Sequence, residues 1–81
     1  MTLPRDLSGD QLVRLLRRYG YEVTRQTSSH IRLTSTRMGK EHHLTVPDHK
    51  ELRVGTLNAI LADIAIYLEM EKAGLVTELL G

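Results

Sequence analysis

The side chains best suited to chemistry lie in two short stretches, residues 28–34 and residues 41–47, which together hold three of the four histidines. Each stretch alternates polar and apolar residues, as is typical of a β-strand with one buried face. The polar residues 35–40 between them, with Gly39 near the end, predict the loop of a hairpin. An imidazole takes or gives a proton near neutral pH, so a histidine on an open strand face is a candidate general acid or base.

Strand geometry divides these side chains between two faces, because successive residues point to opposite sides. The apolar residues of both strands, together with His42, are expected to face a core. The residues expected on the outer face are His30, Arg32, Thr34, His43 and Thr45. Because His42 and His43 are adjacent, they point to opposite sides and are poorly placed to share one ion, so no metal site is predicted.

The elements that must position this hairpin follow from the rest of the chain. Ser8 and Gln11 form a capping box, which predicts a helix that ends near Gly20. Residues 21–26 alternate and predict a first strand. A second helix is predicted from about Gly55, and a short last helix over residues 71–80, since each has apolar residues at helical spacing. Those expected to face the core are Leu12, Leu15, Leu16, Tyr19, Leu57, Ile60, Leu61, Ile64, Leu68, Leu75, Val76 and Leu79.

The predicted order is therefore α-β-β-β-α with an added C-terminal helix, in an α+β fold. Three antiparallel strands with the helices on one face leave the other face open to solvent. This arrangement is that of the double-stranded RNA-binding type of fold. Residues 1–81 are expected to form one domain, since no linker and no internal repeat divides them.

Composition excludes several classes of protein. The chain has 81 residues and no cysteine, which excludes disulfide scaffolds and thiolate metal sites. No apolar run resembles a signal peptide or is long enough to span a membrane, so a cytoplasmic protein is expected. The net charge is only +1, but residues 1–53 carry ten of the eleven Lys and Arg against six acids, whereas the remainder carries one against four. A basic first part is compatible with an anionic partner or with ordinary surface charge.

The sequence resembles the HicA family, the small toxins of bacterial toxin–antitoxin pairs. The resemblance rests on the Ser-His-Ile-Arg-Leu run that begins at Ser29, on the His-His-Leu-Thr-Val-Pro run that begins at His42, and on residues 49–61. Members commonly carry a Gly-Ser-His motif, and Ser28 stands here at the position of its glycine. The histidine of that motif, which is the family's catalytic residue, is present as His30.

This resemblance implies an RNA endonuclease that cleaves mRNA without a metal or other cofactor and is held inactive by a HicB-type antitoxin. Cleavage through the internal 2′-OH of RNA needs a base, a phosphate stabiliser and a proton for the leaving oxygen. An ordinary histidine, with a pKa near ~6.5, can serve as base or acid. His30 is then the catalytic residue, and Ser29, Arg32, Lys40 and His43 are candidate RNA-binding residues, with His43 also a candidate second acid by its direction.

Two other functions remain compatible with the sequence. One is an RNA-binding module of the same fold that has no catalytic activity, in which the outer arginine and histidines make electrostatic contacts alone. The other is a protein-interaction domain whose basic surface binds an acidic partner. RNA binding without cleavage would favour the first, and salt-sensitive protein binding without RNA affinity would favour the second.

Overall fold

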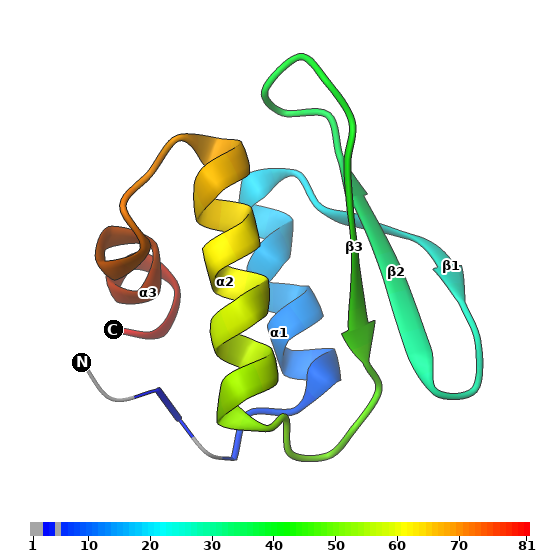
Figure 1. The fold of residues 1–81 in the computed structure, drawn as a ribbon. Coiled ribbons are helices and arrows are strands. Elements are labelled where there is room, and N and C mark those ends of the chain that lie inside the picture. Colours follow the sequence, from blue (N-terminus) through cyan, green and yellow to red (C-terminus); the bar gives the residue numbers. More distant parts are fainter. Residues whose placement is uncertain (1–2, 5) are drawn as a thin grey trace.

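A computed structural model describes residues 3–4 and 6–81, in which the helices cover one face of a three-stranded sheet (Figure 1). The elements are α1 (Gly9–Leu16), the 3₁₀ turn η1 (Arg17–Tyr19), β1 (Glu22–Gln26), β2 (His30–Ser35), β3 (His42–Pro47), α2 (Val54–Leu68) and α3 (Lys72–Leu80). The predicted α-β-β-β-α order with a C-terminal helix is confirmed, and the fold is α+β. No helix in the described ranges is long and apolar enough to cross a membrane.

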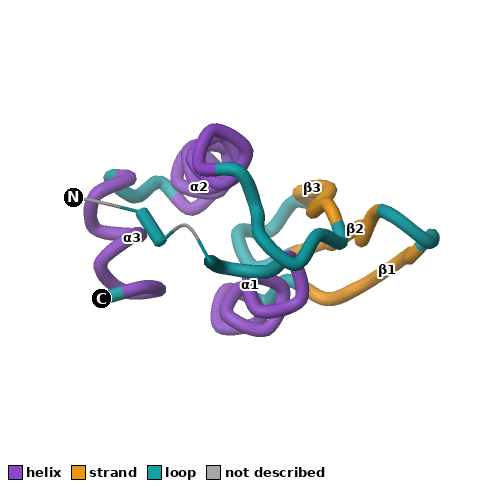
Figure 2. The backbone as a smooth tube through the Cα atoms, turned by 90° about the horizontal axis from the view of Figure 1, so that it is seen from below, coloured by secondary structure: helices purple, strands orange, loops and turns teal. Residues whose placement is uncertain are grey.

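The sheet is antiparallel in the order β1-β2-β3, so β2 lies at its centre. Seen along the strands, α1 and α2 lie side by side against one face, and α3 lies on the far side of both helices (Figure 2). The apolar residues of the hairpin face these helices: Ile31, Leu33, Leu44 and Val46 are all buried. His30, Arg32, His43 and Thr45 are exposed on the opposite face, as the alternation predicts.

The first helix begins as predicted. Ser8 accepts a hydrogen bond from the Gln11 backbone, and the Gln11 side chain accepts one from the Ser8 backbone. The helix is shorter than expected, because its last turn, Arg17–Tyr19, tightens into the 3₁₀ form before Gly20 ends it with a φ of 81°. A left-handed residue at this position is usually glycine, which has no Cβ to clash.

The two later helices bury the predicted residues. Leu57, Ile60, Leu61, Ile64 and Leu68 of α2 are buried, and so are Leu75, Val76 and Leu79 of α3. The chain breaks between these helices at Glu69, which ends α2 with a φ of 56°. Leu15 of α1 is only partly buried, whereas Val13, which was not expected inside, is 5% exposed.

His42 faces the helices, as predicted, and joins β3 to α2 and to the start of β1. Its Nδ1 lies 2.6 Å from the Tyr21 hydroxyl oxygen, and its Nε2 lies 3.3 Å from a carboxylate oxygen of Asp63. Its ring stacks on that of Tyr67, with the ring centroids 4.6 Å apart. Burial raises the pKa of the Tyr21 phenol. His42 therefore contributes to the packing of β3 against α2, on the opposite face of the sheet from His43.

Three segments meet at the end of the sheet where β2 begins. The backbone N–H of Asp48 donates to the Ser29 carbonyl at 2.9 Å, and that of Gly9 donates to the His49 carbonyl at 2.9 Å. Gly9 lies so close to β3 that a Cβ atom there would be 2.1 Å from the Pro47 carbonyl oxygen. The β1–β2 turn, the β3–α2 connection and the start of α1 are thereby held together around His30.

Candidate functional site

His30 is the first residue of β2 and directly follows a tight turn. The Thr27 N–H donates to the His30 carbonyl at 2.9 Å, and the His30 N–H donates to the Thr27 hydroxyl at 3.2 Å. With the Asp48–Ser29 hydrogen bond, these contacts fix the turn from both sides. The backbone of His30 is therefore well held, while its side chain is exposed on the open face of the sheet.

The imidazole of His30 is held through one nitrogen only. The Ser29 hydroxyl oxygen lies 2.9 Å from Nδ1, and Nε2 forms no hydrogen bond or ion pair with any residue in the described part of the chain. A serine hydroxyl can donate to Nδ1 or accept from it, so Ser29 accommodates either tautomer of the ring. Nε2 is consequently available to a bound molecule: with the proton on Nδ1 it can accept a proton as a base, and in the doubly protonated imidazolium it can donate one as an acid.

Ser28 does not strain this turn. Among the non-glycine residues that the structure describes, Glu69 alone has a positive φ, so Ser28 adopts a backbone conformation that any L-residue can reach. A serine in place of the family's glycine is therefore sterically acceptable here.

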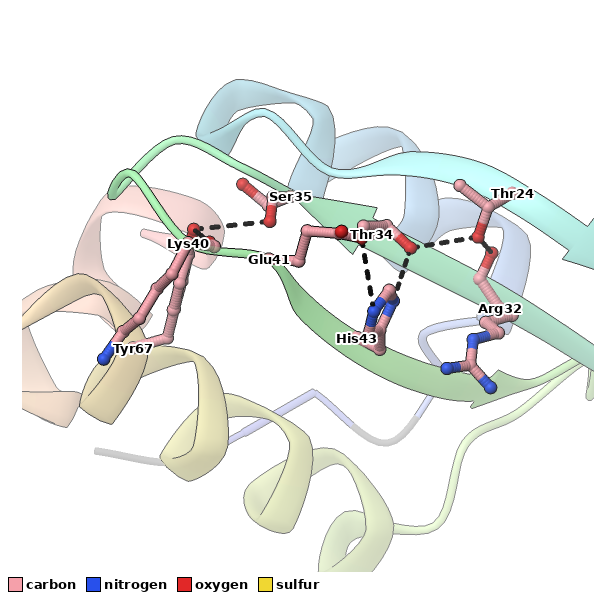
Figure 3. A network of polar contacts seen from close by, with 8 residues as sticks. All are labelled: Thr24, Arg32, Thr34, Ser35, Lys40, Glu41, His43 and Tyr67. Atoms are coloured by element: carbon pink, nitrogen blue, oxygen red, sulfur yellow. Dashed lines mark hydrogen bonds and ion pairs between the residues drawn. The ribbon is translucent and has the colours of Figure 1, made fainter.

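Arg32 lies on the same face, two residues after His30 and about 7 Å further along β2. Its guanidinium forms no hydrogen bond or ion pair with any described residue. In Figure 3 the Arg32 side chain extends away from Thr24, and no dashed contact reaches its guanidinium. Arg32 is thus a free cation near His30, as its predicted role requires.

A second free arginine, Arg25, was not among the predicted site residues. Simple alternation in residues 21–26 places Arg25 on the same face as the buried Tyr21. The structure instead has a β-bulge: Val23 pairs with Leu33, but Arg25 pairs with Arg32, leaving Thr24 as the extra residue. The Thr24 hydroxyl contacts the Thr34 hydroxyl at 3.0 Å and the Arg32 carbonyl at 3.5 Å. The bulge turns Arg25 to the outer face, directly opposite Arg32.

His43 lies further from His30 than the shared face indicates. It pairs with Thr34, which is four residues, or roughly 13 Å, along β2 from His30. Figure 3 shows its ring between Thr34 and Glu41: Nδ1 lies 2.8 Å from the Thr34 hydroxyl, and Nε2 lies 3.5 Å from a Glu41 carboxylate oxygen. Proton transfer needs hydrogen-bond distance, so His30 and His43 are not brought together around one phosphate.

Lys40 lies in the β2–β3 loop, at the opposite end of β2 from His30. Its side chain runs beside Tyr67, away from His43 (Figure 3). The Tyr67 hydroxyl lies 2.5 Å from the Lys40 carbonyl oxygen and 3.0 Å from the Met38 nitrogen, so it fixes the loop from α2. Of the predicted site residues, the structure brings together Ser29, His30 and Arg32, while His43 and Lys40 lie apart from them.

Acidic side chains mark the same far end of the outer face. Glu22 pairs with Thr34 in the register, and Glu41 contacts His43. The arginine row at residues 25 and 32 lies nearer His30. The open face is therefore positive toward His30 and carries carboxylates toward the β2–β3 loop.

Comparison with known proteins identifies the family. A family model described as HicA toxin of bacterial toxin-antitoxin matches residues 9–66, which extend from the first residue of α1 to the last turn of α2. Neither the curated proteins nor the solved structures give a match. The matched segment exceeds half of the 81 residues and includes the whole sheet and the His30 turn. The resemblance noted in the sequence is confirmed, and the chain belongs to the HicA family, the toxins of bacterial toxin–antitoxin systems.

Proposed function

We propose that the chain is an endoribonuclease that cleaves mRNA, that His30 is its catalytic residue, and that a HicB-type antitoxin holds it inactive. As a toxin of a toxin–antitoxin system, the chain has an antitoxin partner. The proposal assigns the chemistry to the outer face of the sheet, at the end where Ser29, His30 and Arg32 lie together. The observation that carries it is the His30 imidazole, exposed on that face and held through Nδ1 with Nε2 free.

RNA supplies its own nucleophile for this reaction. A base removes the proton from the 2′-OH, and the 2′ oxygen attacks the adjacent phosphorus. The bond from phosphorus to the 5′ oxygen breaks, and that oxygen takes up a proton from a general acid or from water. The products are a 2′,3′-cyclic phosphate and a 5′-hydroxyl. His30 Nε2 acts as the base when the ring is neutral or as the acid when the ring is the imidazolium; in both forms Nδ1 carries a proton, which the Ser29 hydroxyl can accept.

Charge on the pentacoordinate phosphorus needs a cation close by. Arg32, which has no partner among the described residues, supplies a permanently charged guanidinium on the same face. The guanidinium fork matches the geometry of two phosphate oxygens. Its position along β2 supports a role in binding the substrate backbone and stabilising its charge.

The decisive experiment compares the purified wild type with His30→Ala and His49→Ala on single-stranded RNA and on DNA of matching sequence. His49 is a matched control because it is an exposed histidine in the β3–α2 connection. We expect wild type and His49→Ala to cleave RNA and leave DNA intact, since DNA lacks the 2′-OH. His30→Ala should lose about 10²-fold or more in rate, as removal of a positioned acid or base implies.

The same variants separate the competing functions. His30→Ala should keep its thermal transition, because the side chain is exposed. Expression at matched levels in a bacterium without the antitoxin should arrest growth and deplete message for the wild type but not for His30→Ala. RNA binding by the wild type without cleavage would instead establish a non-catalytic RNA-binding module. Equal toxicity of both proteins would remove His30 from the mechanism.

A further inference from the structure

The outer face carries two arginines directly opposite each other on neighbouring strands. Arg25 of β1 pairs with Arg32 of β2, and both side chains are exposed. Like charges that face each other across two antiparallel strands destabilise the pair. No carboxylate among the described residues contacts either guanidinium. The folded protein thus holds two adjacent positive charges that only a bound anion would neutralise.

The row continues onto the third strand. Arg32 pairs on its other side with Thr45 of β3, which is also exposed and whose hydroxyl forms no hydrogen bond with a described residue. The result is a line of hydrogen-bond donors across all three strands, with two guanidiniums and one hydroxyl. Guanidiniums form forked hydrogen bonds with phosphate oxygens, and hydroxyls donate to the same oxygens. This donor set suits a phosphodiester phosphate.

The position of the row relative to His30 indicates which polymer it fits. One strand step of two residues, about 7 Å, separates it from His30. One nucleotide of an extended single strand spans a length of this order, so phosphates at His30 and at the row can be neighbours on one chain. Glu22 and Glu41 lie beyond the row toward the β2–β3 loop and repel a polyanion from that end.

We propose that Arg25 and Arg32, assisted by Thr45, bind the phosphate of single-stranded RNA next to the one that is cleaved at His30. The identity of the ligand rests on the proposed function, but the site itself rests on the bulge-dependent pairing of Arg25 with Arg32. The bulge at Thr24 is then functional, because without it Arg25 would point to the other face of the sheet.

Binding of a single-stranded 2′-O-methyl RNA, which lacks the nucleophile and is not cleaved, tests the site apart from the reaction. Fluorescence anisotropy over a range of salt concentrations is measured for wild type, Arg25→Gln, Arg32→Gln and Arg14→Gln. Arg14→Gln is the matched control, because this variant also removes one positive charge but does so on α1, where Arg14 forms an ion pair with Asp10. We expect each outer-face variant to lose roughly five- to tenfold in affinity, as the loss of a charge-assisted phosphate contact implies.

Salt dependence provides a second readout. The slope of log affinity against log salt should become shallower by about 0.7 for each phosphate contact that is lost on a single strand. Arg14→Gln should change neither affinity nor slope. Thermal unfolding without RNA should show Arg25→Gln to be as stable as wild type or more stable, because the repulsion between the arginines is relieved. Weak binding then reflects a lost contact and not a lost fold.

The outcomes separate this site from the proposed function. If wild type cleaves RNA but Arg25→Gln binds within about twofold of Arg14→Gln, the phosphate site is wrong while the enzyme stands. If no RNA is cleaved but binding still depends on Arg25, the site stands and the enzyme is wrong. If Arg25→Gln binds RNA normally but no longer co-purifies with a co-expressed antitoxin, the arginine pair contacts an acidic protein surface. The RNA site is then overturned.

Discussion

Ser29 Oγ lies 2.9 Å from Nδ1 of His30, so the residue that precedes the proposed catalytic histidine also orients its ring. The carbonyl of Ser29 is held in turn by the N–H of Asp48 from the β3–α2 connection. Through its side chain and its backbone, Ser29 thus links the imidazole to the β3–α2 connection. We therefore propose that Ser29 is a positioning residue, which acts on the reaction through His30.

Replacing Ser29 with alanine should slow cleavage and leave substrate binding unchanged. Loss of one hydrogen bond of about 1 kcal/mol lowers kcat roughly fivefold, because the ring then samples unproductive orientations. Steady-state kinetics on RNA should show the fall in kcat with KM unaltered, and Ser29→Thr, which keeps a hydroxyl, should restore most of the rate. A raised KM with normal kcat would show that Ser29 contacts the RNA directly.

Gly9→Ala should destabilise the protein even though alanine is the better helix former. The added Cβ would lie 2.1 Å from the Pro47 carbonyl oxygen and 3.2 Å from its carbon, which are backbone atoms that cannot rotate away. Overpacking of this kind costs about 1–3 kcal/mol in the free energy of unfolding. Urea denaturation measures it.

Gly74→Ala is the matched control for Gly9→Ala. Gly74 lies within α3, and nothing is within 4 Å of the Cβ that alanine would add. Helix propensity then acts alone and should raise the free energy of unfolding by about 0.5–1 kcal/mol. If Gly9→Ala were stabilising as well, the close approach of α1 to β3 would be incorrect.

Tyr67→Phe should loosen the β2–β3 loop. The hydroxyl receives the Met38 N–H and donates toward the Lys40 carbonyl, whereas the ring stacks on His42 and remains in the variant. Losing these contacts should cost about 1–2 kcal/mol in the free energy of unfolding. Hydrogen exchange should accelerate at Met38 and its neighbours in the loop but not at the His30 turn.

The control for the loop is Tyr19→Phe, which also removes one phenolic hydroxyl. The Tyr19 hydroxyl donates to the Glu78 carboxylate at 2.7 Å, on the side of the molecule that faces α3. This variant should leave exchange in the β2–β3 loop unchanged. Equal acceleration in both variants would mean that the loop responds to global stability and not to the Tyr67 hydroxyl.

The sequence predicts the faces of this molecule well, because burial imposes a strict period on each element. Ile31 and Leu33 had to be inside for a small chain to have a core, and that alone placed His30 and Arg32 outside. The capping box at Ser8 is equally local, since both partners lie within one turn. Local patterns of this kind can be read without knowledge of the partner strand.

Register and bulges cannot be read in the same way. Arg25 lies outside because two residues of β1 face one of β2, which is decided by pairing across strands and is invisible in the alternation of residues 21–26. The separation of His43 from His30 is likewise set by the pairing of His43 with Thr34. The sequence thus predicts direction correctly for both histidines but gives no distance between them.

Alkaline pH should destabilise the fold through its buried tyrosines. Burial raises the pKa of the Tyr21 phenol above its ordinary value, and burial with the Glu78 hydrogen bond raises the pKa of Tyr19. Above pH 10 the unfolded chain therefore loses phenolic protons that the native protein keeps, so the free energy of unfolding falls as pH rises. Urea denaturation between pH ~8 and ~12 should show this decline, and Tyr21→Phe should show a shallower one.

At neutral pH, Tyr21→Phe should itself be less stable by about 1 kcal/mol, because it loses the hydrogen bond to His42. The slope and the neutral-pH offset are separate quantities, and an unchanged slope in this variant would show that Tyr21 ionises as easily in the native protein as in the unfolded chain.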